Sequence, residues 1–145
     1  MGAVSEWLDD VVRAHLDGVD GIGAPFVTAL REIEAGRKQS HWSWYVFPQA
    51  PGLGHSPMSR RFAVPSDEAA VAFLEHPVTG PNYLAIMSAV ITQLDSGASL
   101  RAVLGAPDDA KFMSSLTLMQ EVATRECLVP AAAVLTDLQR RSPGV

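Results

Sequence analysis

Apolar residues along this chain recur mostly every three to four positions, which is the spacing of one face of an α-helix. Near the N-terminus, four such residues form a stripe that Trp7 flanks: Leu8, Val11, Val12 and Leu16. Asp17-Gly18 then supplies a stop, and a second helix is predicted from Ala24 to Ala35. Pro25 suits the first turn of that helix, and Gly36 suits the position after its end.

The same spacing continues in the second half of the chain. Ser66 is suited to cap a short helix that ends at Glu75, a helical turn is expected from Ser99 to Leu104, and Pro107 and Pro130 each mark the start of a further helix. Three apolar stripes are predicted to face the core: Leu84, Met87, Ile91 and Leu94; Phe112, Leu116, Met119 and Val122; and Val134, Leu135 and Leu138. The pattern predicts one compact all-α domain over residues 1–145, with about six to eight short helices and no significant sheet.

The segment from Arg37 to Phe47 is ambiguous. Trp42, Trp44 and Val46 alternate as in a strand, but the neighbouring elements are helices and no second strand is evident. A lone strand leaves its backbone groups without partners, so a short helix or an ordered irregular segment is favoured.

Composition narrows the class of protein. The chain has 145 residues, 48% hydrophobic residues and a formal net charge of -5, which fits a folded globular domain and disfavours a dedicated duplex-DNA binder. The N-terminus lacks the basic region of a secretory signal, and no apolar run approaches the ~20 residues that span a bilayer. The single cysteine, Cys127, excludes an intrachain disulfide and reads as a small buried hydrophobe. We expect a soluble cytoplasmic protein without membrane association, whose oligomeric state is open and for which a monomer is the simpler expectation.

Charge is unevenly distributed along the sequence. No acidic residue occurs from Ala35 to Ser66, while this segment contains four cationic residues: Arg37, Lys38, Arg60 and Arg61. Subtracting this +4 from the total of -5 leaves -9 for the rest of the chain. Such a segment attracts anions, and guanidinium groups bind phosphate or carboxylate oxygens in a forked geometry. The segment is therefore the candidate site.

Within the segment, His41 and Lys38 are the candidate catalytic residues. If this part of the chain is helical, Lys38, His41 or Trp42, and Tyr45 share one edge, which would place a cation beside an imidazole and a phenol. Arg37, Trp42 and Tyr45 are then candidate ligand-binding residues. The alternative is that the aromatic residues, above all Trp44 and Phe47, are simply core, with His41 as a hydrogen-bonded strut and Lys38 and Arg37 solvated at the surface.

A compact loop follows, and its glycines permit close approach of a ligand. Gly52, Gly54 and Ser56 are ligand-binding candidates together with Gln49, although the loop lacks the spacing of known phosphate-binding motifs and can equally be a plain turn. Arg60 and Arg61 are also candidates. Because two adjacent arginines cannot face the same way, we expect one to pair within the fold, with Glu32 or Glu34, and the other to face a ligand.

Further along the chain, Lys111 and Ser115 lie four residues apart and share a helix face, which suits an anion clamp or an activated hydroxyl. A buried serine bonded to a helix carbonyl is the alternative. Asp108 has the position of a helix-start residue. Four scattered histidines without ligand spacing indicate no metal site, and no cofactor is implied.

Longer matches give a family resemblance. The run from Gly36 to Gln49, the Gly52-Leu53-Gly54 loop with Ser56, His76-Pro77 with Gly80, Gly105 with Asp108 and Lys111, and Ser114 to Leu118 together resemble a bacterial family known as domain of unknown function 1810. The resemblance implies an all-helical fold and a cytosolic bacterial protein, and it implies no established activity. Family members often end in a tail bearing Gly-Asp-Thr-Leu, from which the residues Arg140 to Val145 depart.

Three functional hypotheses follow. The first is a protein that binds an anionic nucleotide-like or ADP-ribose-like small molecule through residues 37–61, and, if it is an enzyme, uses His41 as general acid or base while Lys38 and Arg60 stabilise negative charge. The second is a non-catalytic protein-interaction module that uses the same aromatic and basic residues. Binding of single-stranded RNA is the third and least favoured hypothesis, because nucleic acid is an unlikely partner for so acidic a chain. Whether any reaction is catalysed stays open.

Overall fold

A computed structural model of the chain describes residues 2–141, and these form nine helices. They are α1 (Ala3–Asp17), α2 (Phe26–Glu34), α3 (Ser43–Val46), α4 (Pro57–Phe62), α5 (Asp67–Glu75), α6 (Thr79–Asp95), α7 (Leu100–Leu104), α8 (Asp108–Arg125) and α9 (Val129–Arg141). Within this range the one β-type pairing is an isolated bridge between Val19 and Gly23. The all-α prediction is confirmed. The helix count exceeds the expected six to eight because α3 and α4, of four and six residues, lie between the longer elements.

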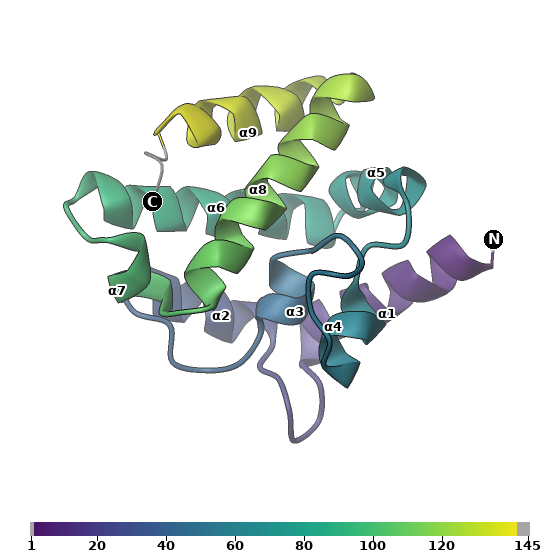
Figure 1. Ribbon diagram of the computed structural model, residues 1–145, viewed down its shortest axis with the longest axis horizontal. Coiled ribbons are helices and arrows are strands. Elements are labelled where there is room, and N and C mark those ends of the chain that lie inside the picture. Colours follow the sequence, from purple (N-terminus) through teal and green to yellow (C-terminus); the bar gives the residue numbers. More distant parts are fainter. Residues whose placement is uncertain (1, 142–145) are drawn as a thin grey trace.

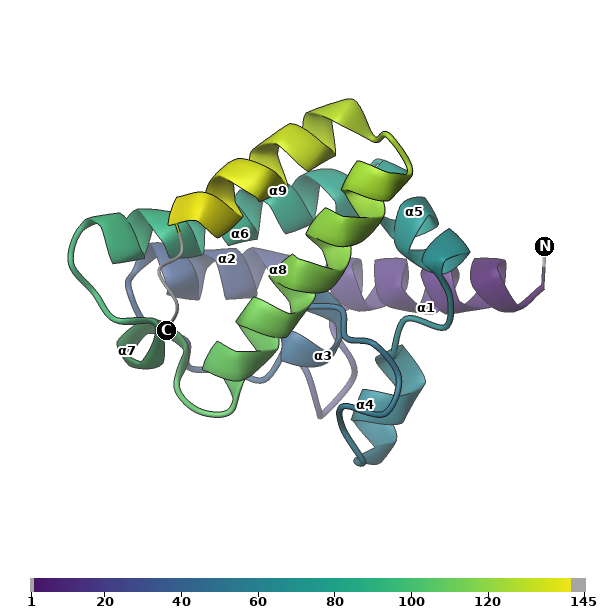
Figure 2. The ribbon, with the colours of Figure 1, turned by 45° about the horizontal axis from the view of Figure 1, so that its top comes forward.

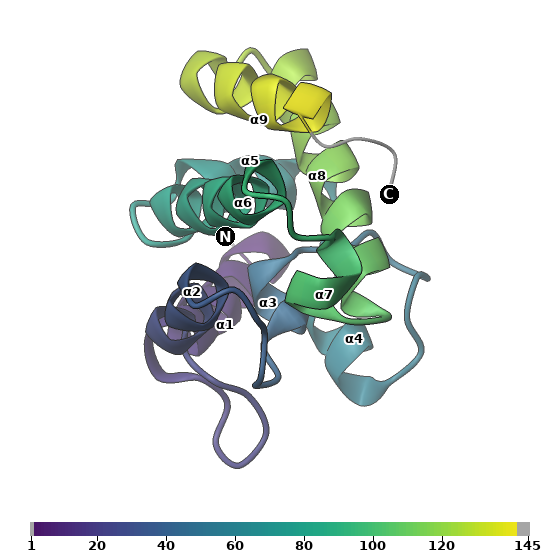
Figure 3. The same ribbon diagram turned by 90° about the vertical axis from the view of Figure 1, so that its left-hand side faces the viewer.

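Helix α6 forms the centre of the fold. Figures 1 and 2 show α8 crossing in front of it, and Figure 3 shows α9 on one side of it with α1 and α2 on the other. Its buried residues include Tyr83, Ile86, Met87, Val90 and Ile91. Gly80 lets the start of α6 approach α5 closely, since a Cβ at that position would lie 2.2 Å from the carbonyl oxygen of Leu74.

The helix starts follow local sequence signals. Ser66 accepts a hydrogen bond from the main-chain nitrogen of Ala69 at the start of α5, and Ser99 accepts one from Ala102 at the start of α7. Ser56 does the same for α4, a helix that the apolar pattern did not predict. The predicted start of α8 after Pro107 is confirmed, and so is its predicted stripe, since Phe112, Leu116, Met119 and Val122 are all buried.

Three local predictions are wrong. In α1 the buried residues are Trp7, Val11, Ala14 and His15, whereas Leu16 is 60% exposed. The buried face of α1 thus includes the polar residue His15 in place of Leu16, and it packs against α5 and α2. Val134 of α9 lies at the surface, since its neighbours Ala131, Leu135 and Leu138 face the core instead. Cys127 is exposed in the turn between α8 and α9, where its φ is 58°.

The ambiguous segment is resolved in two parts. Residues 37–42 have no helical structure, and Ser43–Val46 form the single turn α3. Lys38 and His41 precede this turn and do not share a helix edge with Tyr45. The predicted row of cation, imidazole and phenol on one helix edge is therefore wrong. The departure from the family tail begins at Arg140, within α9, and its remaining residues 142–145 lie outside the described residues.

Candidate functional site

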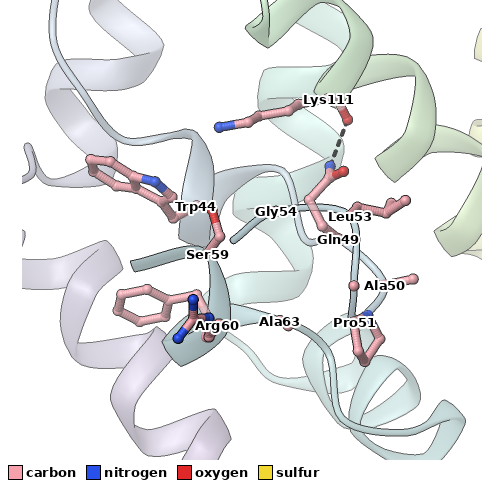
Figure 4. A pocket seen from close by; sticks show the side chains of 12 residues that line it. Trp44, Gln49, Ala50, Pro51, Leu53, Gly54, Ser59, Arg60, Ala63 and Lys111 are labelled. Carbon is pink, nitrogen blue, oxygen red and sulfur yellow. Dashed lines mark hydrogen bonds between the residues drawn. The ribbon is translucent and has the colours of Figure 1, made fainter. Parts of the chain in front are cut away.

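A cleft of about 270 Å³ lies between the loop that follows Pro48, the short helix α4 and the first turn of α8 (Figure 4). Its lining brings together residues from four separate parts of the sequence: Trp44, Gln49, Ala50, Pro51, Gly52, Leu53, Gly54, Ser59, Arg60, Phe62, Ala63 and Lys111. Five of the predicted ligand-binding residues meet here, namely Gln49, Gly52, Gly54, Arg60 and Lys111. Most of the lining is apolar, and the charged groups are few.

The loop is held to the helices by specific hydrogen bonds. The side-chain nitrogen of Gln49 donates to the carbonyl oxygen of Lys111 at 2.7 Å, and the carbonyl oxygen of Gln49 accepts from the main-chain nitrogen of Val64 at 2.9 Å. Gly54 packs against Ser59, and a Cβ at position 54 would lie 2.6 Å from its Oγ. Glycine at this position therefore permits the close approach of loop and α4. Ser56 caps α4 and does not line the cleft.

The two adjacent arginines have different environments. Arg61 forms a two-pronged ion pair with Asp10 of α1, with nitrogen–oxygen distances of 2.7 and 2.8 Å. Arg60 lines the cleft, is exposed, and donates to the carbonyl oxygen of His55 at 2.5 Å. One arginine thus pairs within the fold, as expected. The prediction that its partner is Glu32 or Glu34 is wrong, because α4 lies near α1 and places Arg61 beside Asp10.

The burial of Trp42 and Trp44 is the reverse of what the sequence predicted. Trp42 is fully buried, and its Nε1 donates to Glu32 at 2.9 Å. The Nζ of Lys38 lies 4.8 Å from the centre of its ring. Trp44, expected to be core, is only half-buried and lines the cleft. The aromatic surface available to a ligand is therefore that of Trp44. Phe47 was also expected in the core, and it is fully buried there.

Lys38 is held by an acidic partner. Its Nζ lies 2.8 Å from an oxygen of Asp108, and its side chain is 7% exposed. It also donates to the carbonyl oxygen of Ser40 at 2.5 Å. The Nζ of Lys111 lies 3.7 Å from the other oxygen of Asp108. Two ammonium groups thus share one carboxylate, and the more exposed Lys111, not Lys38, keeps charge available at the cleft.

A second hollow adjoins the cleft on the other side of Trp44 and Lys111, which line both cavities. His41 and Ser43 line this hollow, and its volume is about 270 Å³. His41 is exposed, with its ring centre 6.1 Å from that of Trp44. Ser43 is 4% exposed, and its Oγ has no hydrogen-bond partner among the described residues. Trp44 and Lys111 thus separate two neighbouring hollows, one lined by Arg60 and the other by His41.

Two further candidates are placed in the core. Tyr45 is 1% exposed and donates to the carbonyl oxygen of Ala24 at 2.5 Å, and burial raises its pKa. Ser115 is fully buried and lies 3.0 Å from the hydroxyl of Tyr83, so it does not form a surface pair with Lys111. Each hydroxyl is satisfied by a protein partner, which gives both residues a structural role. Arg37 is exposed and lies outside the cleft.

Sequence reasoning missed two groups that organise this region. Glu32 accepts hydrogen bonds from the main-chain nitrogens of Gln39 and Ser40 and from Trp42, and so fixes the segment that precedes α3. His15 is buried beneath α3. The role of Glu32 could have been suspected, because it lies in the helix directly before a segment that has no acidic residue of its own. The apolar spacing of α1 did not indicate that a histidine would be buried.

Among residues 2–141 there is no group of three or more His, Cys, Asp or Glu side chains placed to hold a metal ion. None of the helices in this range has the length and apolar character needed to cross a membrane.

Comparisons with known proteins identify a family and a solved structure of similar fold. The chain is 30% identical to the conserved hypothetical protein Rv1873 from Mycobacterium tuberculosis, whose crystal structure superimposes with a TM-score of 0.74 over 97% of this chain and 87% of that one. A search of curated proteins found no match. A family model described as "Protein of unknown function (DUF1810)" matches residues 17–138, which include α2 to α8, the cleft and most of α9. By this match over most of its length, the chain belongs to the DUF1810 family.

Proposed function

We propose that the chain binds a small anionic molecule with a planar group, of the nucleotide-like or ADP-ribose-like class, in the cleft beside Trp44. The observation that carries the proposal is the meeting of three side chains at one concavity. Trp44 offers a half-buried aromatic surface, Arg60 lies on the wall formed by α4, and Lys111 reaches the cleft from α8. Aromatic rings stack on planar groups, and these two cations attract and hydrogen-bond anionic oxygens.

The local charge supports an anion over a cation. Asp108 forms an ion pair with Lys111 and also with Lys38, so two positive charges face one negative charge. Among residues 2–141, the Arg60 guanidinium has a carbonyl oxygen and no carboxylate as its partner, which leaves its charge unbalanced. The cleft therefore has an excess of positive charge on a chain that is acidic overall.

In this proposal the chain binds its ligand in the cytoplasm, where nucleotide-like molecules are abundant. His41 lies beside the cleft, in the adjoining hollow, and is the candidate general acid or base if the bound molecule reacts there. Lys38 is not needed for the proposal, because its charge is balanced by Asp108.

Thermal unfolding at fixed salt tests this function with nucleotides, sugar phosphates and ADP-ribose-type compounds. A ligand at about a hundred times its dissociation constant should stabilise the fold by roughly 2.7 kcal/mol, which raises the unfolding midpoint by roughly 5 to 10 °C. We expect Arg60→Ala to reduce this shift and to weaken binding about tenfold or more.

Arg61→Ala is the matched control, since it removes the same charge from the neighbouring position, which lines no part of the cleft. The control should lower the midpoint of the free protein and leave the ligand-induced shift intact. An equal loss in both variants would point to general attraction by charge. No shift with any compound would reject the proposal and favour the alternative, docking of an acidic protein on the same residues.

A further inference from the structure

The side-chain amide of Gln49 has a fixed orientation. Its Nε2 lies 2.7 Å from the carbonyl oxygen of Lys111 and 3.1 Å from that of Phe47. Carbonyl oxygens can only accept hydrogen bonds, so the NH₂ group must face them and both of its protons are used. Figure 4 shows the amide nitrogen directed at the main chain of Lys111.

The oxygen of the same amide is left for a ligand. Among residues 2–141, Oε1 of Gln49 has no hydrogen-bond partner, while Gln49 is half-buried and lines the cleft. An amide oxygen is an acceptor only, because the NH₂ group cannot rotate into its place without breaking both hydrogen bonds. Oε1 is therefore a neutral acceptor of fixed position on a residue that lines the cleft.

This acceptor differs chemically from the cations of the cleft. Arg60 and Lys111 can only donate hydrogen bonds, and they suit acidic oxygens. Oε1 of Gln49 instead accepts a hydrogen bond, which an N–H group on the planar part of a ligand can donate. A ligand complementary to both kinds of group has an acidic part and a planar part that donates a hydrogen bond.

We propose that Gln49 is a specificity-determining residue, which selects ligands whose planar group bears an amino or amide N–H. The inference rests on the proposed function of the cleft and narrows its ligand class. A ligand without the donor leaves Oε1 desolvated and unpaired, and the loss of one neutral hydrogen bond corresponds to ~3- to 10-fold weaker binding. Sites that hydrogen-bond a ligand group discriminate in this way against analogues that lack it.

Isothermal titration of the whole chain tests the inference with two matched pairs of probes. The first pair is adenosine monophosphate and the analogue in which hydrogen replaces the exocyclic amino group, and the second is para-aminobenzoate and benzoate. We expect the amino member of at least one pair to bind ~3- to 10-fold more tightly than its partner. If both members of each pair bind equally, the inference is overturned while the proposed function stands. If none of the four probes binds and the wider panel also gives no thermal shift, the proposed function fails, and the inference fails with it.

The variant Gln49→Met separates selection from support of the loop. Methionine keeps the length of the side chain and removes both the acceptor and the donors. We expect the preference for the amino probe to vanish, while any loss of affinity caused by the two broken loop hydrogen bonds is shared by both probes. A parallel loss of affinity for both members, with their ratio unchanged, would show that Gln49 only holds the loop, and would overturn the inference. Should this variant fail to fold, the probe pairs on the unaltered chain still decide the question.

Discussion

The imidazole of His15 and the main chain of Tyr45 are joined by a hydrogen bond that ties α1 to α3. Nε2 of His15 lies 2.8 Å from the carbonyl oxygen of Tyr45, which can only accept, so Nε2 holds the proton. Nδ1 lies 3.1 Å from the side-chain nitrogen of Asn82 and accepts from it. Both ring nitrogens are satisfied with a single proton, and the ring stacks on Phe26 at an interplanar angle of 2°. The buried histidine is therefore neutral in the folded protein.

Acid should destabilise the fold through His15. Burial lowers the pKa of His15 from 6.5 to about 4, an effect opposed by the hydrogen bond to Tyr45 and increased by the charge of His76. Between these two pH values the unfolded chain binds a proton that the folded chain does not, so stability falls as the pH drops from 6.5 towards 4. The full effect of this group is about 3 kcal/mol. Urea unfolding at a series of pH values measures it.

Two variants isolate this group from the carboxylates that also titrate in acid. His15→Gln can retain a donor toward Tyr45 but cannot titrate, so its free energy of unfolding should be lower near neutrality and should depend less on pH between 6.5 and 4. His55→Gln, at an exposed position, should keep the pH dependence of the unaltered protein. Identical pH slopes for all three proteins would show that His15 is not the responsible group.

Asp108 should be far more important for stability than its neighbour Asp109. Asp108→Asn leaves Lys38 with a side chain that is 7% exposed and no carboxylate partner, and removal of one member of such a pair costs about 3 kcal/mol. Asp109→Asn breaks a pair with Arg101, whose side chain is 75% exposed, and should cost at most about 1 kcal/mol. Chemical unfolding of the two variants compares neighbouring positions in the same turn. Equal losses would mean that Lys38 finds water or another acceptor when Asp108 is neutral.

The relation between sequence and structure differs between the helices and the site. Helix boundaries follow local signals, so the caps at Ser66 and Ser99 could be predicted from their own sequences. The cleft depends on contacts between distant segments, since Gln49 and Lys111 are 62 residues apart and Arg61 and Asp10 are 51 apart. No local pattern indicates such pairs.

The exchange of roles between Trp42 and Trp44 has the same origin. Both residues lie in a segment too short for a helical period, and Glu32 of α2 determines which indole is buried by accepting a hydrogen bond from Trp42. The segment could therefore be recognised as the site region, while the individual side chains that face a ligand could not.

Glu32 should control the order of the segment before α3. Burial alone raises the pKa of this carboxyl, but the hydrogen bonds from Ser40, Trp42 and the main chain lower it overall. The contribution of Glu32 to stability is thus present above its unfolded pKa of 4.5 and is lost as the pH falls through its lower folded value. Glu32→Gln should lower the free energy of unfolding by about 1–3 kcal/mol and speed hydrogen exchange at the amides of Gln39 and Ser40.

Glu34→Gln provides the comparison for Glu32, since Glu34 belongs to the same helix and is exposed. It should leave both the free energy of unfolding and the exchange rates nearly unchanged. If the amides of Gln39 and Ser40 exchange at the same rate in both variants, the segment is held by other contacts. One such contact is the hydrogen bond from the main-chain nitrogen of Lys38 to the carbonyl oxygen of Val103.

Gly80→Ala should reverse the usual effect of alanine in a helix. Gly80 lies in the first turn of α6, where alanine would ordinarily stabilise by about 0.5–1 kcal/mol relative to glycine. Here the added Cβ would lie 2.2 Å from the carbonyl oxygen of Leu74, and main-chain atoms cannot move aside as a flexible side chain can. The start of α6 must then separate from the end of α5, with a cost of about 2–3 kcal/mol. Thermal and urea unfolding measure this loss, and a variant as stable as the unaltered protein would show that α5 and α6 can separate freely. Because neither Gly80 nor Leu74 lines the cleft, ligand binding by the folded fraction should be unchanged.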